Sequence, residues 1–475
     1  MSAEAHGTER PSLFGTDGIR GVVGELYTPD FVANIASAYA TWLRPPGSVL
    51  IGQDFRTTSS GISHLLAGSL QMLGFDVVEM GSMPTPCFQF NVRAFGAKGG
   101  LMVTASHNPP EFNGIKFTGP RGLEIPRDAE AQIQQLFDRR AYLDASWMTA
   151  GTIRSDATGI DRYLDSIRAQ VDASLIRRAN LRVLLDPGNG TSAVTSPRLL
   201  RQIGCQLVTM NSNPDGWFPG RFSEPSEENL IQLAKTVPEV GAAIGIAHDG
   251  DADRVAFIDE RGHYLTGDAS LALLARYVLG QHPGGTVVTS VTTSTVVRDV
   301  VEQAGGRLVV TKSGSLPVAV GVEESRAVFG GEENGHYYWP QHQNAPDGPM
   351  SSAMMIEMIA REGRPLSQLA TEIPVYHLKK QSVPVAPEFR AGVLLHAKAA
   401  LIEGAERMDT TDGIKAFFPG GWLLIRPSGT EPIVRVFAEG TSAERANAFS
   451  ERGVGVVREA LEAAARAAGR LGAPS

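Results

Sequence analysis

The sequence predicts three consecutive α/β domains with mixed, mainly parallel sheets, followed by a C-terminal α+β domain. Continuous apolar runs of strand length alternate with longer helical segments through most of the chain, as in parallel sheets covered on both faces. Glycine or proline marks each boundary, and the final part of the chain changes to closely spaced strand-like runs. With 475 residues, 42% of them hydrophobic, the chain can bury several cores.

The first unit supplies the alternation most clearly. Helical segments are expected at residues 31–43 and 61–73, and apolar strands at 48–54, 75–81 and 99–106. Ligands of such sheets bind at the carboxyl ends of the strands. The last of these strands ends at Ser106, which makes this residue a candidate site.

The same alternation of apolar strands and helical segments occurs in two further units before the C-terminal one. The expected strands are 181–186, 205–211 and 240–247, then 286–291, 307–311 and 327–330, and finally 381–385, 414–418, 422–425 and 433–439. Helices are expected at 394–404 and 443–468, the second ending at Gly469 as its C-cap. The resulting domain limits are 1–150, 151–258, 259–372 and 373–475.

Composition excludes several classes of protein. A net charge of -8 without a basic block argues against a general nucleic-acid or anionic-membrane binder. The two cysteines, Cys87 and Cys205, are far apart, which excludes a disulfide scaffold and a cysteine-built zinc site and suits a reducing cytoplasm. The polar N-terminus is unlike a signal peptide, and no apolar run reaches the ~18 residues of a membrane span. We therefore expect a cytoplasmic protein with neither nucleic-acid nor membrane partners.

The segment around Ser106 is the most informative. Ser106 is followed by His107, Asn108 and Pro109, which indicates a hydroxyl held in a stiff turn at a strand end. An ordinary polar turn has the same composition. The chain lacks the Gly-x-Ser-x-Gly elbow here, so an α/β-hydrolase nucleophile is not indicated.

Three carboxylates on alternate residues, Asp249, Asp251 and Asp253, follow a strand directly. Crowded like charges are costly without a cation, and hard oxygen ligands favour Mg²⁺, Mn²⁺ or Ca²⁺ over zinc. An EF-hand is rejected, because Arg254 occupies the sixth position, where that loop needs glycine, and β-like runs flank the segment. The alternative is a solvated acidic turn.

Three further segments carry polar side chains on glycine-containing loops. Residues 330–336 (GGEENGH) suit hydrogen bonding to sugar hydroxyls, although an ordinary polar turn would have the same composition. Residues 426–432 (RPSGTEP) offer donors to a phosphate, or form a tight hairpin, and are not a Walker loop. In residues 14–21 (FGTDGIRG), glycines flank Arg20, whose guanidinium can face an anion. Together the segments describe a phosphoryl-carrying serine, a cation site, a sugar-reading loop and a clamp for a second phosphate.

In this combination and order the chain resembles the α-D-phosphohexomutase superfamily. The motifs FGTDGIRG, TASHNPPEFNGIKF, DGDADR, GGEENGH and RPSGTEP span nearly the whole sequence. The loop Glu332-Glu333-Asn334-Gly335, with Asn213-Pro214-Asp215-Gly216, looks most like the archaeal-type branch. The resemblance implies four domains around a central cleft, each contributing one motif, with the N-terminal loop added.

The resemblance also implies residue roles. Ser106 resembles the serine that carries the phosphoryl group, and Lys116 the general acid/base; burial is expected to lower the pKa of Lys116 towards neutrality. Arg20, His107 and Arg254 match groups around the phosphoserine. One Mg²⁺ per chain would be held by Asp249, Asp251, Asp253 and an oxygen of phosphorylated Ser106. The sugar loop supplies Glu332, Asn334 and His336, and the phosphate clamp Arg426, Ser428, Gly429 and Thr430.

The implied reaction interconverts the 1- and 6-phosphates of mannose or glucose. It passes through a hexose 1,6-bisphosphate that also serves as activator and must turn end for end in the cleft. A phosphoglucosamine mutase is the alternative, since the turn Gly314-Ser315-Leu316 and the pair Glu333-Asn334 match neither bacterial branch. A metal-dependent sugar phosphatase and a catalytically silent sugar-phosphate binder are less favoured. Small sugar phosphates are the expected partners, and the chain is expected to be a monomer or homodimer.

Overall fold

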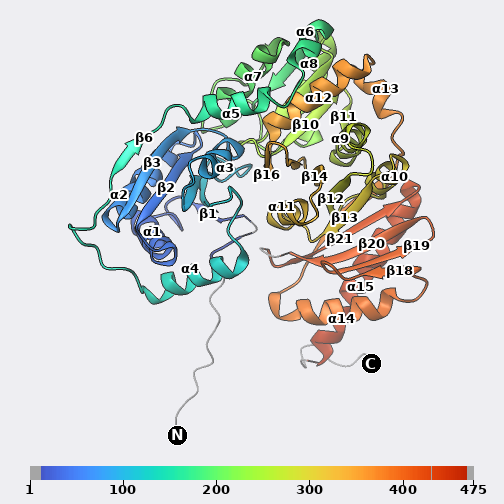
Figure 1. Cartoon of the computed structure of the whole chain (residues 1–475). Coiled ribbons are helices and arrows are strands. Elements are labelled where there is room, and N and C mark those ends of the chain that lie inside the picture. The colour runs from blue at the N-terminus through green and yellow to red at the C-terminus, as the bar shows by residue number, and fades with distance from the viewer. Residues whose placement is uncertain (1–11, 16, 429–430, 468–475) are drawn as a thin grey trace.

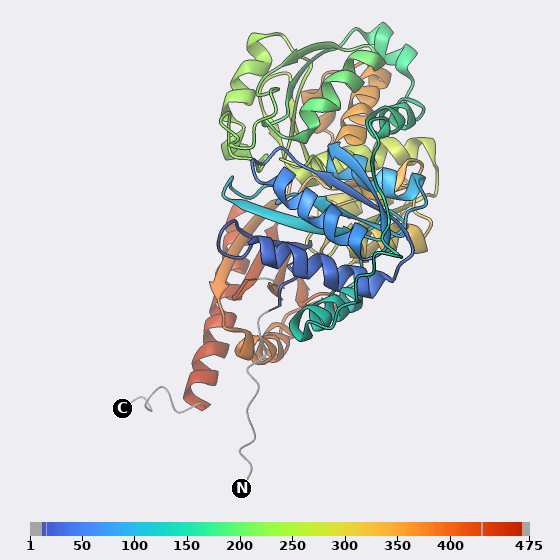
Figure 2. The ribbon, with the colours of Figure 1, turned by 90° about the vertical axis from the view of Figure 1, so that its left-hand side faces the viewer.

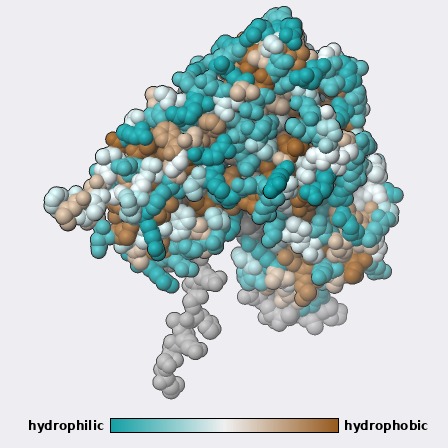
Figure 3. Space-filling view, viewed as in Figure 1, coloured by the Kyte–Doolittle hydropathy of each residue, from teal (hydrophilic) through white to brown (hydrophobic). Residues whose placement is uncertain are grey.

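The computed structural model describes residues 12–15, 17–428 and 431–467. Four domains, each built on one sheet, follow one another in chain order along an arc from blue to red (Figure 1). In the space-filling view the surface is indented between the lobe of the first domain and the lobe of the last (Figure 3). This architecture confirms the predicted fold class of three α/β domains and a C-terminal α+β domain.

Domain I contains a six-stranded sheet in the order β1-β5-β4-β2-β3-β6. Its strands are β1 (Ile19–Val22), β2 (Gly47–Gln53), β3 (Phe75–Ser82), β4 (Gly99–Val103), β5 (Phe112–Thr118) and β6 (Ile153–Ser155). Its helices are α1 (Pro29–Leu43), α2 (Ser59–Met72), α3 (Thr85–Ala94) and α4 (Arg127–Arg139). Strand β2 pairs in parallel with both β3 and β4, whereas β5 runs antiparallel to β4 and β1. Figure 2 shows the dark-blue and blue helices α1 and α2 in front of this sheet.

Domain II has a five-stranded sheet in the order β11-β10-β9-β7-β8. The strands are β7 (Arg182–Asp186), β8 (Gln206–Thr209), β9 (Ile244–His248), β10 (Val255–Asp259) and β11 (Tyr264–Leu265). The helices are α5 (Gly159–Arg168), α6 (Ala173–Ala179), α7 (Ser196–Ile203) and α8 (Ile231–Glu239). The β9–β10 pair is an antiparallel hairpin, so the turn between these strands projects from the carboxyl end of β9.

Domain III repeats this plan with the strand order β13-β12-β14-β15-β16. Its strands are β12 (Thr286–Ser290), β13 (Arg307–Thr311), β14 (Phe329–Gly331), β15 (Tyr337–Trp339) and β16 (Gln343–Pro346). Its helices are α9 (Gly267–Gln281), α10 (Thr295–Gln303), α11 (Ser315–Glu324), α12 (Gly348–Glu362) and α13 (Leu366–Ala370). The buried helix α12 begins at the N-cap Asp347, whose side chain accepts a hydrogen bond from the backbone N–H of Met350.

Domain IV is an antiparallel sheet in the order β17-β21-β20-β19-β18, covered by two helices. The strands are β17 (His377–Pro384), β18 (Arg407–Asp409), β19 (Ile414–Phe418), β20 (Gly421–Pro427) and β21 (Ile433–Gly440). The helices are α14 (Arg390–Leu401) and α15 (Ala443–Ala467). Leu423, Val436 and Val457 pack in one core cluster between the sheet and the helices.

Most predicted elements agree with the structure to within a few residues. The strand expected at 240–247 is shorter, because α8 continues to Glu239 and Gly241 turns the chain with φ +61° before β9 begins at Ile244. Several antiparallel strands, both at sheet edges (β1, β11 and β16) and inside sheets (β5, β10 and β15), were not predicted from the sequence. The predicted C-cap Gly469 lies outside the described residues.

Buried polar contacts fix the domains against one another. Tyr163 of α5 donates a 2.7 Å hydrogen bond to the Asp347 carboxylate at the start of α12, which joins domains II and III. Gln343 of β16 donates to the carbonyl oxygen of Pro86 in α3, which joins domains III and I. Within the described chain, no helix is both long enough and apolar enough to cross a membrane.

Candidate active site

Ser106 lies in the turn between β4 and β5 and is 2% exposed. Its φ of +50° is uncommon for a residue other than glycine, so the surroundings must hold this turn in place. The backbone N–H of Ser106 donates to Thr104 Oγ1 at 2.9 Å, and its Oγ donates to Asp249 Oδ2 at 2.8 Å. The domain I hydroxyl therefore faces the β9–β10 turn of domain II.

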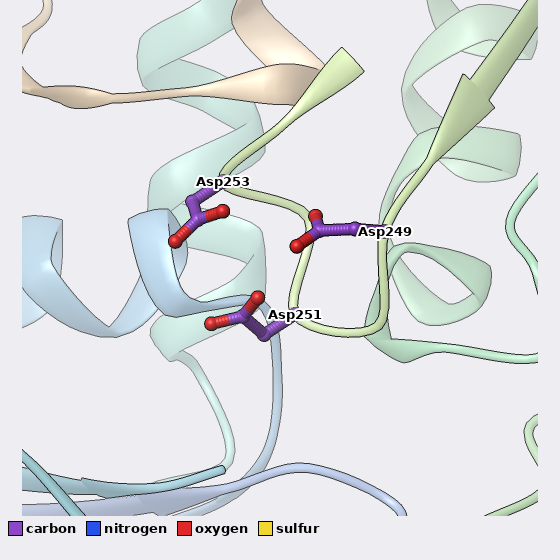
Figure 4. Close-up of side chains that lie close together, drawn as sticks. All are labelled: Asp249, Asp251 and Asp253. Carbon is purple, nitrogen blue, oxygen red and sulfur yellow. The ribbon is translucent and has the colours of Figure 1, made fainter. Parts of the chain in front are cut away.

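The β9–β10 turn gathers Asp249, Asp251 and Asp253, as Figure 4 shows, with one oxygen of each within 4.8 Å of the others. Burial raises the pKa of Asp249 well above its usual range, and the charges of Asp253 and Asp251 raise it further. Among the described residues, buried Asp251 Oδ1 has no hydrogen-bond partner. Three crowded oxygen donors and an unpartnered lone pair fit a hard divalent cation, so this cluster can hold a metal as the sequence predicts.

Gly250 allows the metal loop to approach the serine turn. A Cβ at this position would stand 2.6 Å from the carbonyl oxygen of Ser106, closer than non-bonded atoms allow. The carbonyl oxygen of Gly250 accepts a 2.9 Å hydrogen bond from the N–H of Thr191, which fixes the loop from its other side. Glycine is therefore required between the first two aspartates.

Lys116 of β5 is 3% exposed and lies among three carboxylates. Its Nζ is 2.7 Å from Asp17, 2.9 Å from Asp251 and 2.8 Å from Asp253. Burial by itself lowers the pKa of Lys116, but the three carboxylates outweigh it and raise that pKa well above its usual value. The expectation of a pKa near neutrality is therefore wrong for this arrangement, since the sequence did not show the acidic neighbours.

Arg20, His107 and Arg254 surround the serine turn, as their motifs imply. Arg20 donates to Asn108 Oδ1 at 3.2 Å, and His107 Nδ1 lies 3.3 Å from Ser106 Oγ. Arg254 donates to both carboxylate oxygens of Glu224, at 2.8 and 2.6 Å. Burial and the nearby Arg254 lower the pKa of His107 to about 4, so its imidazole is neutral at pH 7.

The sugar-loop residues line the same site from domain III. His336 lies between two carboxylates, with Nε2 3.3 Å from Asp253 Oδ1 and Nδ1 3.4 Å from Glu332 Oε2. Burial opposes the charged imidazole, but these acids raise the pKa of His336 to about 10. Glu332 Oε1 accepts from the N–H of Gly314 at 3.0 Å, and Asn334 Oδ1 accepts from the N–H of His336.

Arg426, the arginine of the predicted phosphate clamp, is the penultimate residue of β20 in domain IV. Its Nε donates to Asp412 Oδ2 at 2.5 Å, and this oxygen also accepts from the N–H of Ser313 in domain III. Ser428 is buried, whereas Gly429 and Thr430 lie outside the described residues. Gly314, which follows Ser313, donates through its N–H to Glu332 of the sugar loop. Glu332 contacts His336, and His336 contacts Asp253 of the metal loop, so polar contacts connect the clamp to both loops.

Several residues of the site were not identified from the sequence. Asp17 pairs with both Lys116 and Arg20, and Glu224 pairs with Arg254. Thr85 donates to Asp251 Oδ2 at 2.6 Å from the first turn of α3. Asp17 lies within the motif around Arg20, and this was the available signal. Thr85 reaches Asp251 because domains I and II are packed together, whereas Glu224 meets Arg254 through the fold of domain II itself.

The arrangement suits phosphoryl transfer to and from a hydroxyl. When bound, a divalent cation neutralises charge on a transferring phosphoryl group. The guanidinium groups of Arg20 and Arg254 and the Lys116 ammonium add fixed positive charge beside Ser106. A neutral His107 is able to hydrogen-bond the serine oxygen without repelling these cations.

Four family models match successive parts of the chain. They describe the α/β/α domains I, II and III of phosphoglucomutase/phosphomannomutase at residues 11–143, 161–262 and 266–376, and the C-terminal domain of that family at residues 385–454. The matches occur in family order and together cover most of the sequence.

Curated relatives and a solved structure agree with these models. The phosphoglucomutase/phosphomannomutase of Thermococcus kodakarensis is 39% identical over 95% of this chain and 99% of its own length. A probable phosphoglucosamine mutase of Methanopyrus kandleri is 39% identical over 94% of this chain and 98% of its own. A phosphoglucomutase/phosphomannomutase family structure from Burkholderia thailandensis aligns with a TM-score of 0.85 and 27% identity, over 94% of this chain and 97% of that one. The chain therefore belongs to the phosphoglucomutase/phosphomannomutase family of the α-D-phosphohexomutases, with archaeal relatives among its matches.

Proposed function

We propose that the protein is a phosphohexomutase that interconverts a hexose 1-phosphate and a hexose 6-phosphate through phosphorylated Ser106. The observation that carries this proposal is the 2.8 Å contact between Ser106 Oγ and Asp249, beside the Asp249–Asp251–Asp253 cluster and Lys116. A nucleophilic hydroxyl, a cation site and a proton-carrying group are the parts that phosphoryl transfer needs.

The proposed reaction consists of two phosphoryl transfers, one from Ser106 to the sugar and one back. In the first half, a sugar hydroxyl oxygen bonds to the phosphorus on Ser106, the Ser106 O–P bond breaks, and the hydroxyl proton, relayed by the carboxylates around the Lys116 ammonium, ends on the Ser106 oxygen. The hexose 1,6-bisphosphate then turns end for end. In the second half, the Ser106 oxygen bonds to the phosphorus of the other phosphoryl group, that sugar O–P bond breaks, and the serine proton passes back to the freed sugar oxygen.

Mg²⁺ is the cation we propose for Asp249, Asp251 and Asp253, with Ser106 or its phosphate completing the set. Carboxylate oxygens are the ligands this ion prefers, and it commonly retains bonds to substrate phosphates. Hexose 1,6-bisphosphate would act as both intermediate and activator, because it supplies the phosphoryl group that loads Ser106.

Substrate binding divides between domains III and IV in this proposal. Glu332, Asn334 and His336 would read the sugar hydroxyls, and Arg426, Ser428, Gly429 and Thr430 would hold the phosphate that does not react. The contact of Asp412 with both Arg426 and the N–H of Ser313 supports a clamp that borders the sugar loop. For this division we propose the domain limits predicted from the sequence, which are 1–150, 151–258, 259–372 and 373–475.

A glucosamine phosphate is the second candidate substrate, because relatives of equal identity carry the names phosphoglucomutase/phosphomannomutase and probable phosphoglucosamine mutase. The deciding experiment compares kcat/KM for mannose, glucose and glucosamine 1-phosphates with added glucose 1,6-bisphosphate. A higher value for mannose or glucose supports the main proposal, and a higher value for glucosamine supports the alternative. We place the reaction in the cytoplasm, which suits the two free, buried cysteines.

A further inference from the structure

Arg56, which follows β2 in domain I, is 2% exposed and binds the serine turn. Its Nη2 donates to the carbonyl oxygens of Ser106 at 3.0 Å and Asn108 at 2.6 Å. Its Nη1 donates to the carbonyl oxygens of Pro109 at 2.5 Å and Phe112 at 3.0 Å, and its Nε donates to Asp54 at 3.1 Å. One guanidinium thus holds four carbonyl groups of the turn that carries Ser106.

Arg221 of domain II repeats this arrangement at the metal loop. Its side chain is 6% exposed, and its Nε donates to Asp186, at the end of β7, at 2.9 Å. Its Nη2 donates to the carbonyl oxygen of His248 at 2.6 Å, immediately before Asp249. Its Nη1 donates to the carbonyl oxygens of Phe222 and Ser223 at 3.0 and 3.2 Å.

The loop at residues 211–224 brings the two arginines into one assembly. The Phe218 ring covers the Arg56 guanidinium, with 4.9 Å between Cζ and the ring centroid. Ser223, whose carbonyl oxygen binds Arg221, places its Oγ 3.5 Å from the carbonyl oxygen of Ser106. Residues 211–224 therefore contact both arginines and the backbone of the Ser106 turn.

We propose that Arg56 and Arg221 are positioning residues that hold the Ser106 turn and the Asp249–Asp253 loop in register across the domain I–domain II boundary. Neither touches the reacting atoms; each acts through the backbone of a loop that does. The proposal rests on the proposed function, since it assigns Ser106 as phosphoryl carrier and the aspartates as metal ligands.

Two features separate this role from that of an ordinary buried ion pair. Each arginine uses one nitrogen for an aspartate and the other two for carbonyl oxygens of loops in the site. The Ser106 turn also needs support, because its φ of +50° is unfavourable for serine. A lysine keeps the charge but lacks the planar fork of five N–H donors, so Arg→Lys variants remove the positioning while leaving charge in place.

We expect the variants Arg56→Lys and Arg221→Lys to have different defects. Arg56→Lys should slow the phosphorylation of Ser106 by glucose 1,6-bisphosphate about tenfold or more, because misplaced reacting atoms cost rate steeply. Its affinity for Mn²⁺, measured by electron paramagnetic resonance, should fall less than that of Arg221→Lys, because Arg56 contacts the turn of one proposed ligand, Ser106, and leaves the loop of the three aspartates in place. Arg221→Lys should weaken Mn²⁺ binding about tenfold, as loss of a group that orients metal ligands does.

The experiment uses the full chain, intact-protein mass spectrometry for Ser106 phosphorylation, and Arg201→Lys on the exposed face of α7 as the matched control. Phosphorylation at the parental rate in Arg56→Lys, or parental Mn²⁺ affinity in Arg221→Lys, would overturn the proposal. Should Arg56→Lys fail to fold, Phe218→Leu, which removes the ring over Arg56, must slow phosphorylation about threefold; an unchanged rate overturns the proposal equally. If the parent protein itself is not phosphorylated on Ser106, the proposed function fails instead.

Discussion

Ser106 and Asp249 are 143 residues apart in sequence and belong to different domains, yet the serine Oγ lies 2.8 Å from the aspartate Oδ2. This contact places the proposed phosphoryl carrier at the edge of the carboxylate cluster. Lys116 extends the cluster, since its Nζ lies within 3 Å of Asp17, Asp251 and Asp253. The catalytic proposal thus depends on how domains I and II are packed, as well as on the motifs that each contains.

Removal of metal should abolish activity. Dialysis against a chelator is expected to reduce turnover to background, and added Mg²⁺ to restore it, because the three aspartates repel one another without a cation. Asp251→Asn should weaken Mn²⁺ binding about tenfold or more in a paramagnetic resonance titration. Asp165→Asn, on the exposed surface of domain II, is the matched control. Full activity after complete metal removal would contradict the cation role.

Loss of the clamp arginine should act mainly on substrate binding. Arg426→Ala is expected to raise KM about 10- to 100-fold, since a charged hydrogen bond to phosphate is worth roughly 1.5–3 kcal/mol. Its kcat should change little, because the contact exists in both ground and transition states. Steady-state kinetics with glucose 1-phosphate measure both values, with Arg452→Ala on α15 as control. A fall in kcat at constant KM would assign Arg426 a different role.

The sugar loop depends on the backbone of Gly335. Its φ is +91°, and a Cβ would stand 2.5 Å from the carbonyl oxygen of Val255. Gly335→Ala is therefore expected to lower the free energy of unfolding by about 2 kcal/mol and to raise KM for the sugar phosphate. Gly280→Ala in α9, where the added methyl meets no atom within 4 Å, should instead be neutral or slightly stabilising. Equal thermal midpoints for the two variants would contradict this account.

Lys415 makes stability depend on pH at the domain III–domain IV boundary. Burial lowers its pKa to about 7, and its Nζ donates to the carbonyl oxygen of Val291 at 2.7 Å and lies 3.6 Å from the Trp422 ring centroid. The charged groups that act on it are Glu439, Arg298, Asp409 and Asp268.

The direction in which the free energy of unfolding changes with pH follows from the protons that Lys415 binds in the folded and unfolded states. Above pH 7 the folded protein leaves Lys415 neutral while the unfolded chain keeps it charged up to its ordinary pKa of 10.5, so stability rises with pH across this window. Relative to Lys415→Met, the parent should gain roughly 1 kcal/mol per pH unit between pH 7 and 10. Thermal unfolding of both proteins across that range measures the difference. A constant difference would show that Lys415 does not titrate there.

Sequence patterns predicted what is local. The parallel strands were visible as apolar runs, and Ser106 and the three aspartates were visible because they follow β4 and β9 directly. Edge strands such as β11, with two residues, carry too little pattern to detect. The raised pKa of Lys116 and the contact of Thr85 with Asp251 depend on carboxylates of another domain. Glu224 meets Arg254 only through the fold of domain II, so no local pattern reveals any of these contacts.

The turnover of Ser106→Ala tests the central claim most directly. With glucose 1-phosphate and added glucose 1,6-bisphosphate, kcat should fall by at least about 10³-fold, because no phosphoryl carrier remains. The thermal midpoint should be close to that of the parent, and Mn²⁺ should still bind through the three aspartates, with lower affinity because one proposed ligand is lost, which shows that the site is still assembled. Near-normal turnover in a folded Ser106→Ala protein would contradict the account.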